Sequence, residues 1–247
     1  MKERKGTTTF LAVLFFFAAA VSSAWGQGVS VTTGAGYKQM VEELGKAYRE
    51  SGAELEEMYG GPIGQILVQI KQGSGANVVI SDKGTLDAAS QGVEFGRFEA
   101  LGDTVLVLAW RKGVALSIPG DLEKEEIARV AMPDPKAAIY GRAASKFLES
   151  SEIGARIGAK LSVVSSVPQV FSYLVSGEMD AGFVNRVMVL NGGDKLGGWL
   201  EIAEGYPPLK MVAAVVQGHE KDPKILDFLA FLTGEKGRGI LKRHGIW

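Results

Sequence analysis

The chain has 247 residues and a formal net charge of −1, which suits one large domain or two lobes of about 100 residues each. This near-neutral charge gives no electrostatic reason to expect nucleic-acid binding. The absence of cysteine excludes disulfides, a thiolate metal site, a cysteine nucleophile and a lipid anchor on an N-terminal cysteine. With only two histidines, the chain also gives no support for a histidine-rich metal site.

Residues 1–26 have the three-part layout of a secretory signal peptide. They contain a basic start, an apolar run from Phe10 to Val21, and small residues at Ala24 and Gly26. The apolar run is shorter than the roughly 20 residues that span a bilayer, so a retained anchor is the alternative. We expect an exported, periplasmic protein that begins at Gln27 and, without three basic residues and one acid, carries a formal charge of −3.

The remaining chain alternates short apolar strands with amphipathic helices, which is typical of sheets covered by helices. The expected strands are Val29–Thr33, Glu54–Tyr59, Asn77–Ser81, Asp103–Trp110, Val130–Pro133, Leu161–Val164, Ala181–Val184 and Met211–Val216. The expected helices are Lys38–Glu50, a segment with Ile66, Leu67 and Ile70 on one face, Ile139–Ser150, Val167–Gly177, Ile225–Thr233 and Glu235–His244.

Two of these strands bracket the second half of the pattern and are apolar on both faces, as expected for strands that cross between two lobes. They are Asp103–Trp110 and Met211–Val216. We therefore predict an α/β fold of two lobes with a ligand cleft between them, each lobe a helix-covered and mostly parallel sheet. Lobe I would be discontinuous, with residues 27–107 and 211–247, and lobe II would contain residues 108–210. One continuous doubly wound sheet is the alternative.

Ligands of open α/β sheets bind where strands lead into helices, and the free N–H groups of a helix N-terminus attract anions there. The glycine-rich loop YGGPIG, residues 59–64, is such a place. It is neither a P-loop nor a full GxGxxG motif, so the local sequence alone favours a tight turn over an anion site. Arg186 directly follows a predicted strand region and could bind an oxyanion through two parallel hydrogen bonds. No serine stands in a GxSxG motif to pair with a histidine, and we expect no enzymatic activity.

Five stretches resemble one protein family. QIKQGSGANVVIS (69–81) is similar to "QIxxGAxADVFIS", DTVLVL (103–108) to "NxLVLV", MPDPKAAIYGRAA (132–144) to "xxDPxxxPxGxYA", SVPQVFSYLVSGEMDAGFV (166–184) to "xVxQxLxYVxxGEADAGIVY", and the last 23 residues to "FLxFLxSxEAQxIxxKYGF". Over nearly the whole mature chain, the sequence thus resembles the periplasmic molybdate-binding type of solute-binding proteins of ABC transporters, in the type II periplasmic binding protein superfamily. The resemblance implies two lobes that close on a dehydrated oxyanion, no cofactor, and a permease partner in the inner membrane. We also expect a monomer.

The residues that hold the oxyanion in that family are changed in this chain. Matching the motifs places Gly36 at the first family hydroxyl, Pro62, Ile63 or Gly64 at the second, and Asn185 at a tyrosine, whereas the backbone donors at Tyr140 and Val167 are kept. The ligand-binding residues that follow from the resemblance and from the loops are Gly36, Tyr37, Ile63, Gly64, Tyr140, Val167, Asn185 and Arg186.

Each lost hydroxyl donor is expected to cost about 1.5–3 kcal/mol of binding free energy for a desolvated oxyanion. Three hypotheses follow. The chain binds a molybdate- or tungstate-like oxyanion through backbone N–H groups and Arg186; it binds a different ligand, such as an organic carboxylate or phosphate; or it acts outside transport, as a sensor or an accessory surface protein.

Overall fold

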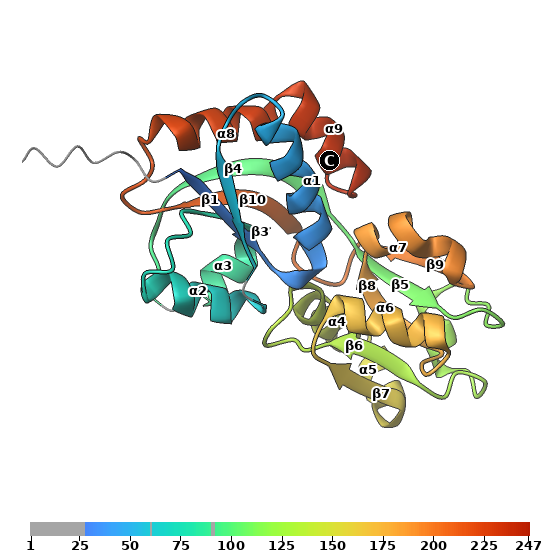
Figure 1. The fold of residues 1–247 in the computed structure, drawn as a ribbon. Coiled ribbons are helices and arrows are strands. Elements are labelled where there is room, and N and C mark those ends of the chain that lie inside the picture. Colours follow the sequence, from blue (N-terminus) through green and yellow to red (C-terminus); the bar gives the residue numbers. More distant parts are fainter. Residues whose placement is uncertain (1–27, 60, 90–91) are drawn as a thin grey trace, which may run out of the picture.

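A computed structural model describes residues 28–59, 61–89 and 92–247. The expected signal peptide, 1–26, lies outside the described residues. Two five-stranded sheets, each covered by helices, form two lobes (Figure 1). The prediction of a two-lobed α/β fold is confirmed, and the alternative of a single continuous sheet is excluded.

The sheet of lobe I has the strand order β2-β1-β3-β10-β4. The strand β1 is parallel to β2 and β3, whereas β10 is antiparallel to β3 and β4. These strands are β1 (Val29–Thr33), β2 (Leu55–Met58), β3 (Val78–Asp82), β4 (Phe95–Thr104) and β10 (Leu209–Val216). The helices of lobe I are α1 (Lys38–Arg49), α2 (Ile63–Lys71), α3 (Lys83–Ala89), α8 (Pro223–Thr233) and α9 (Glu235–Arg243), with a short 3-10 helix at Ala35–Tyr37.

The sheet of lobe II has the order β7-β6-β8-β5-β9, with β6 parallel to β7 and β8, and β5 antiparallel to β8 and β9. Its strands are β5 (Leu106–Trp110), β6 (Val130–Pro133), β7 (Leu161–Val164), β8 (Ala181–Asn185) and β9 (Gly198–Ile202). Its helices are α4 (Ile139–Ser150), α5 (Ile153–Ile157), α6 (Val167–Ser176) and α7 (Arg186–Gly192), with 3-10 turns at Pro119–Glu123, Gly158–Lys160 and Gly193–Lys195.

Burial on both faces explains why the central strands are continuous apolar runs. In β3, Val78 and Ile80 belong to the main hydrophobic core, whereas Val79 between them packs with Ile66 and Leu67 of α2. Alternate residues of a strand point to opposite faces, so each face of the sheet needs its own helical cover. The helices α1 and α8 cover one face, and α2 and α3 cover the other (Figure 1).

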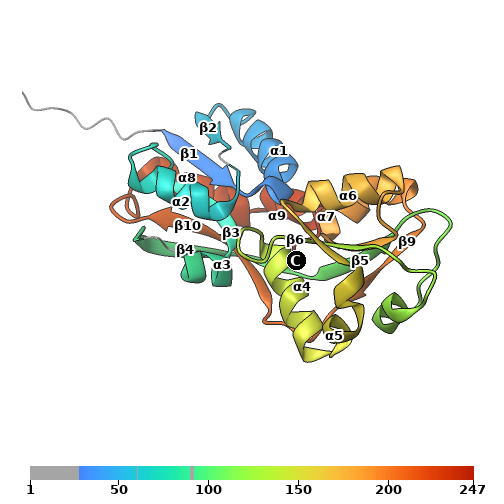
Figure 2. The same ribbon diagram turned by 90° about the horizontal axis from the view of Figure 1, so that it is seen from below.

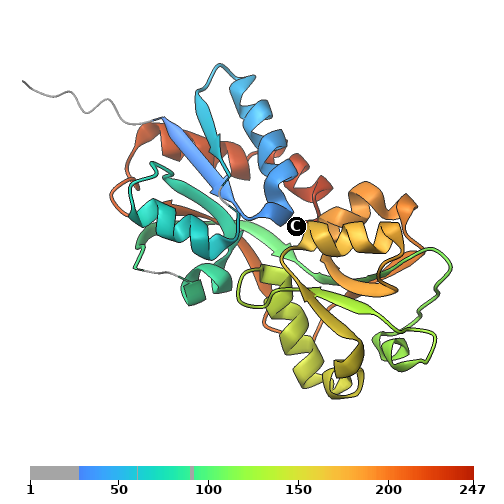
Figure 3. The ribbon, with the colours of Figure 1, turned by 60° about the horizontal axis from the view of Figure 1, so that its bottom comes forward.

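The chain passes between the lobes twice, from β4 to β5 and from β9 to β10 (Figure 3). The expected single strand Asp103–Trp110 is instead two strands that meet at Val105. The strand β4 pairs with β10, whereas β5 pairs with β8 and β9, so the backbone changes sheet at this residue. The expected lobe boundaries at 107/108 and 210/211 fall inside β5 and β10, and we propose to place them at Val105 and within 203–208.

Several elements were not expected from the sequence: the strand β9, the first part of β4, and the helices α3, α5 and α7. The strands β4 and β9 lie at sheet edges and are largely exposed, so their sequences lack a continuous apolar run. The three helices have five to seven residues each, which is too short for a clear helical period.

Candidate functional site

A cavity of about 310 Å³ lies between the two lobes. Lobe I contributes three short segments and lobe II contributes two, and each segment precedes or begins a helix or ends a strand. The lining residues are Gly34, Ala35, Gly36, Tyr37, Gly61, Pro62, Ile63, Ser81, Ala137, Ala138, Ile139, Tyr140, Ser165, Ser166 and Val167. None of these residues carries a charged side chain.

The N-termini of three helices meet at this cavity. The N-cap and first residue of α2 line it from lobe I, as do those of α4 and α6 from lobe II. The first N–H groups of a helix have no partner within the helix and carry partial positive charge, so a ligand with acceptor oxygens satisfies them well. At the start of α6, the Ser166 side chain accepts a hydrogen bond from the N–H of Gln169, and Pro168 has no N–H. The backbone N–H of Val167 is therefore the first-turn donor that remains for a ligand in the cavity.

Three serine hydroxyls also line the cavity. Ser166 Oγ accepts a hydrogen bond from Gln169 N (3.4 Å) and keeps its own proton free, while Ser165 Oγ donates to Gln169 Oε1 (2.8 Å). Ser81 lies near the end of β3, is 1% exposed, and its Oγ has no hydrogen-bond partner among the described residues. Ser81 Oγ and Ser166 Oγ are therefore side-chain donors available to a ligand from lobe I and lobe II respectively.

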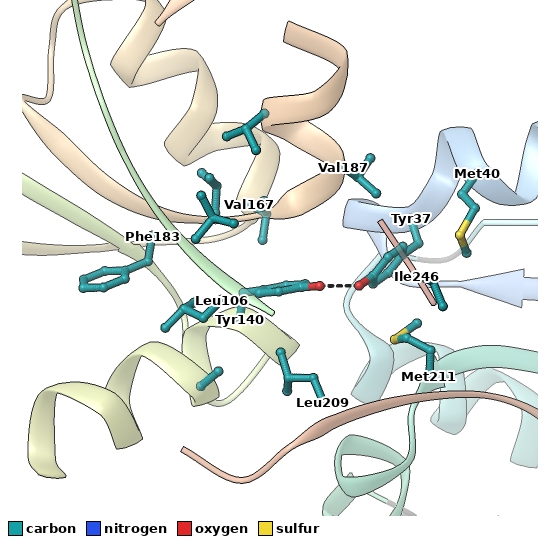
Figure 4. Close-up of a cluster of buried hydrophobic side chains, with 14 of the residues drawn as sticks. Tyr37, Met40, Leu106, Tyr140, Val167, Phe183, Val187, Leu209, Met211 and Ile246 are labelled. Atoms are coloured by element: carbon teal, nitrogen blue, oxygen red, sulfur yellow. Dashed lines mark hydrogen bonds between the residues drawn. The ribbon is translucent and has the colours of Figure 1, made fainter. Parts of the chain in front are cut away.

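Two tyrosines, one from each lobe, meet beside the cavity (Figure 4). The hydroxyl groups of Tyr37 and Tyr140 form a hydrogen bond, and Tyr140 Oη also bonds Thr104 Oγ1 at 3.2 Å. Both rings are 2% exposed. Burial raises the pKa of Tyr37 and of Tyr140 well above the ordinary value, so both phenols are neutral at physiological pH.

Two further side chains connect the lobes around the cavity. Asn185 Nδ2 donates to Gly36 O at 2.9 Å, while Asn185 Oδ1 accepts from Met188 N at the start of α7. Arg142, in α4, donates to Asp82 Oδ2 at 3.2 Å and to the hydroxyl of Thr85. These bonds and the tyrosine pair hold the two lobes against each other, so the structure is a closed form.

Arg186 lies away from the cavity and makes a different interlobe contact. Its guanidinium forms an ion pair with Glu201 Oε1 at 3.1 Å, and its guanidinium carbon lies 3.3 Å from the centre of the Trp247 ring. Glu201 belongs to β9, the edge strand that the sequence did not predict. Trp247 belongs to lobe I because its backbone pairs with Asp103 in β4. Arg186 therefore contacts a carboxylate and an aromatic ring rather than the cavity.

The structure brings together five of the eight predicted site residues on the cavity wall: Gly36, Tyr37, Ile63, Tyr140 and Val167. The other three, Gly64, Asn185 and Arg186, are not among the lining residues. The eight predicted site residues do not include the three serines, although Ser81 and Ser165 stand where a predicted strand leads into a loop. That position at the carboxyl end of a strand was the signal that could have identified them.

The described part of the chain contains no group of three or more His, Asp or Glu side chains placed to hold a metal ion. Within residues 28–59, 61–89 and 92–247, none of the helices has the length and hydrophobicity needed to cross a bilayer.

Comparisons with known proteins agree with this architecture. Residues 29–246 match the family model described as bacterial extracellular solute-binding protein. The molybdate-binding protein ModA of Rhodobacter capsulatus is 25% identical over 250 residues, which cover 98% of this chain and 95% of that protein. The structure is similar to the periplasmic molybdate-binding protein of Azotobacter vinelandii, with a TM-score of 0.75, 23% identity and 89% and 98% of the two chains covered. It is also similar to L-phospholactate-bound PEB3, a Campylobacter jejuni protein, with a TM-score of 0.69, 16% identity and 88% and 98% covered.

Proposed function

Because the chain belongs to the bacterial extracellular solute-binding protein family, we propose that it captures a small anion between its two lobes and delivers it to an ABC importer. The observation that carries this proposal is the cavity at which the N-termini of α2, α4 and α6 meet. Delivery would take place in the periplasm, at a permease in the inner membrane, and the protein itself would catalyse no reaction.

The chemistry of the cavity favours an anion over a cation or a neutral sugar. Its donors are backbone N–H groups and hydroxyls, and none of its described lining residues has a carboxylate to neutralise a cation. A sugar needs many paired donors and acceptors around its rim, which the alanine, proline and isoleucine walls do not offer. An anion needs donors alone, and helix N-termini supply them without a charged side chain.

Two classes of anion are candidates. The Rhodobacter relative is named a molybdate-binding protein, which favours a tetrahedral metal oxyanion. The PEB3 structure holds L-phospholactate in a similar fold, and the hydroxyl ligands expected from the family are replaced at Gly36 and around Ile63, which favours an organic anion.

Isothermal titration calorimetry tests the proposal. The protein is titrated with molybdate, tungstate, sulfate, phosphate, lactate, succinate and phospholactate, and with the neutral amide of lactate as a matched control. We expect at least one anion to bind with micromolar or tighter affinity, and the amide not to bind, because only the anion satisfies the free N–H groups. Absence of binding across all seven anions would contradict the proposal.

A further inference from the structure

Ser81 has a buried hydroxyl group with no hydrogen-bond partner among the residues that the structure describes. Buried hydroxyls in proteins are nearly always hydrogen-bonded, because an unpaired one has lost its hydrogen bonds to water without replacing them. Four buried side-chain polar atoms lack a partner in the described residues: Ser30 Oγ, Ser81 Oγ, Arg186 Nε and His244 Nδ1. Of these four residues, only Ser81 lines the cavity between the lobes.

The backbone around Ser81 holds this hydroxyl in place. Ser81 pairs with Val212 of β10 in the antiparallel ladder, so its Cα position is fixed by the sheet. The next residue, Asp82, uses its carboxylate for other partners: Lys210 N at 3.0 Å, Thr85 N at 2.8 Å and Arg142 at 3.2 Å. Within 28–59, 61–89 and 92–247, Ser81 Oγ has no side-chain partner, and it is thus a preorganised hydrogen-bond donor on the lobe I side of the cavity.

On the basis of the proposed function, we propose that Ser81 donates a hydrogen bond to the ligand, and that the ligand is a small organic acid with a short hydrocarbon body rather than a tetrahedral metal oxyanion. The acid group would accept hydrogen bonds from Ser81 and from the N-termini of α4 and α6. The hydrocarbon body would lie against the apolar walls.

The size of the cavity supports an organic acid. A tetrahedral oxyanion has five non-hydrogen atoms and, with about 30 Å³ per atom as an upper bound from the share of one water molecule in the liquid, fills at most ~150 Å³. The cavity of about 310 Å³ is roughly twice that and suits a ligand of ~10 non-hydrogen atoms. An oxyanion would leave much of this space without a contact in the closed form.

The apolar walls of the cavity also favour an organic acid as the ligand. Most lining side chains are apolar or absent: Ala35, Pro62, Ile63, Ala137, Ala138, Ile139, Val167 and the three glycines at 34, 36 and 61. A tetrahedral oxyanion presents acceptor oxygens in every direction, so some of them would face these walls and remain unpaired. An organic acid presents its acceptors at one group and leaves carbon atoms for the walls.

Ser30 provides a matched control for the role of Ser81. It lies in the same sheet, is 5% exposed, and its Oγ also lacks a partner, but it does not line the cavity. The experiment compares Ser81→Ala and Ser30→Ala with the unchanged protein by calorimetry against lactate, succinate, phospholactate, molybdate, tungstate, sulfate and phosphate. Ser81→Cys, which keeps the size but is a weak donor, is the second variant at the site.

We expect an organic acid to bind at least tenfold more tightly than each inorganic ion. We expect Ser81→Ala and Ser81→Cys to weaken that binding at least tenfold, and Ser30→Ala to change it less than twofold. Tighter binding of an inorganic ion would overturn the ligand class and leave the proposed function standing. Equal affinity of the Ser81 variants and the unchanged protein would overturn the role of Ser81. Absence of binding for all seven anions would overturn the proposed function itself.

Discussion

Three hydroxyl groups form a buried chain between the lobes, from Tyr37 through Tyr140 to Thr104. Each group has a partner within the chain and none has free access to water. Removing the Tyr140 hydroxyl removes both of these hydrogen bonds, whereas removing the hydroxyl of Tyr37 or Thr104 removes one of them. Of these three hydroxyl groups, that of Tyr140 is therefore expected to contribute most to the stability of the protein.

Tyr140→Phe should lower the free energy of unfolding by about 1–3 kcal/mol, because it removes the buried hydrogen bonds of the Tyr140 hydroxyl to Tyr37 and Thr104. The melting temperature should fall by roughly 3–10 °C for a chain of this length. Thermal unfolding followed by circular dichroism measures the change. Tyr173→Phe is the matched control: the Tyr173 hydroxyl accepts only from Gln169 Nε2 (2.8 Å) on the surface of α6, so its loss should shift the melting temperature by less than 2 °C. Equal shifts for both variants would contradict the role of the buried chain.

Asp180 makes stability depend on acid pH. Burial alone would raise the pKa of Asp180, but hydrogen bonds from Arg129, Arg111 and the backbone N–H of Arg129 outweigh it and hold the pKa at about 2, below the ordinary 3.8. A depressed carboxyl pKa adds stability above the unfolded-state pKa, and that stability is lost as pH falls through the folded-state pKa. We expect a loss of about 2 kcal/mol between about pH 4 and pH 2, measured by urea unfolding at stepped pH.

Asp180→Asn is the control for this pH dependence. It removes the titrating group and its bonds to two arginines, so the variant should be less stable near pH 7 and its stability should fall less steeply below pH 4. A variant with the same slope as the unchanged protein would show that other carboxylates cause the acid sensitivity.

At the scale of single residues, the sequence predicts which backbone positions line the cavity better than it predicts which contacts the side chains make. Tyr140 and Val167 could be placed at the cavity because a helix N-terminus is fixed by the strand that precedes it. The role of Ser81 depends on which partners its hydroxyl lacks, and only three-dimensional neighbours reveal that. The ion pair of Arg186 could not be predicted for a similar reason: its partner Glu201 lies in β9, a strand with no clear sequence pattern.

At the scale of elements, the strands buried on both faces and the long amphipathic helices were predictable. Their apolar residues recur because they must face a core, as Met40, Val41 and Leu44 of α1 do. Edge strands and one- to two-turn helices bury little, so tertiary contacts rather than local sequence determine them. The break at Val105 is of this kind, since the apolar run Thr104–Trp110 contains the end of β4 and all of β5, which pair in two different sheets.

The helix α4 carries a contact that favours the closed form. Its Arg142 is 31% exposed in the side chain and bonds Asp82 and Thr85 of lobe I. Arg142→Ala should weaken ligand binding about fivefold, mainly by faster dissociation, because the closed form loses ~1 kcal/mol relative to the open one. Stopped-flow dissociation of the ligand identified by calorimetry measures this rate.

Arg156→Ala is the matched control for Arg142→Ala. Arg156 pairs with Glu123 at 2.8 Å within lobe II, so its removal should leave the dissociation rate within twofold. Equal dissociation rates in both variants and the unchanged protein would show that the Arg142 contact does not stabilise closure.

At the scale of the whole molecule, two chain crossings and a set of side-chain contacts relate the lobes. The two crossings, at Val105 and within 203–208, join the lobes through the backbone (Figure 2). They are covalent and persist in every state, whereas the side-chain contacts exist only when the lobes meet. The stacking of Trp247 on Arg186 lies outside the cavity and belongs to the second kind. It can therefore be altered without touching the ligand.

Trp247→Ala should shift the ligand-free protein toward the open form, because a cation–π contact of about 1 kcal/mol is lost. Small-angle X-ray scattering should show a larger radius of gyration for this variant without ligand and the same radius with ligand at saturation. Trp199→Ala is the control, since Trp199 lies in the edge strand β9 of lobe II and is 37% exposed. A larger radius in both variants would indicate a general loosening rather than a lost interlobe contact.

The uncharged lining of the cavity has a consequence for how the ligand can be identified. Among the described lining residues only Tyr37 and Tyr140 can titrate, and burial raises the pKa of each well above the ordinary value. Between about pH 5 and pH 9 the receptor side of the site therefore holds one protonation state. Any change of affinity across that interval reports the ionisation of the ligand. Measuring the binding affinity as a function of pH therefore gives the pKa of an unidentified ligand.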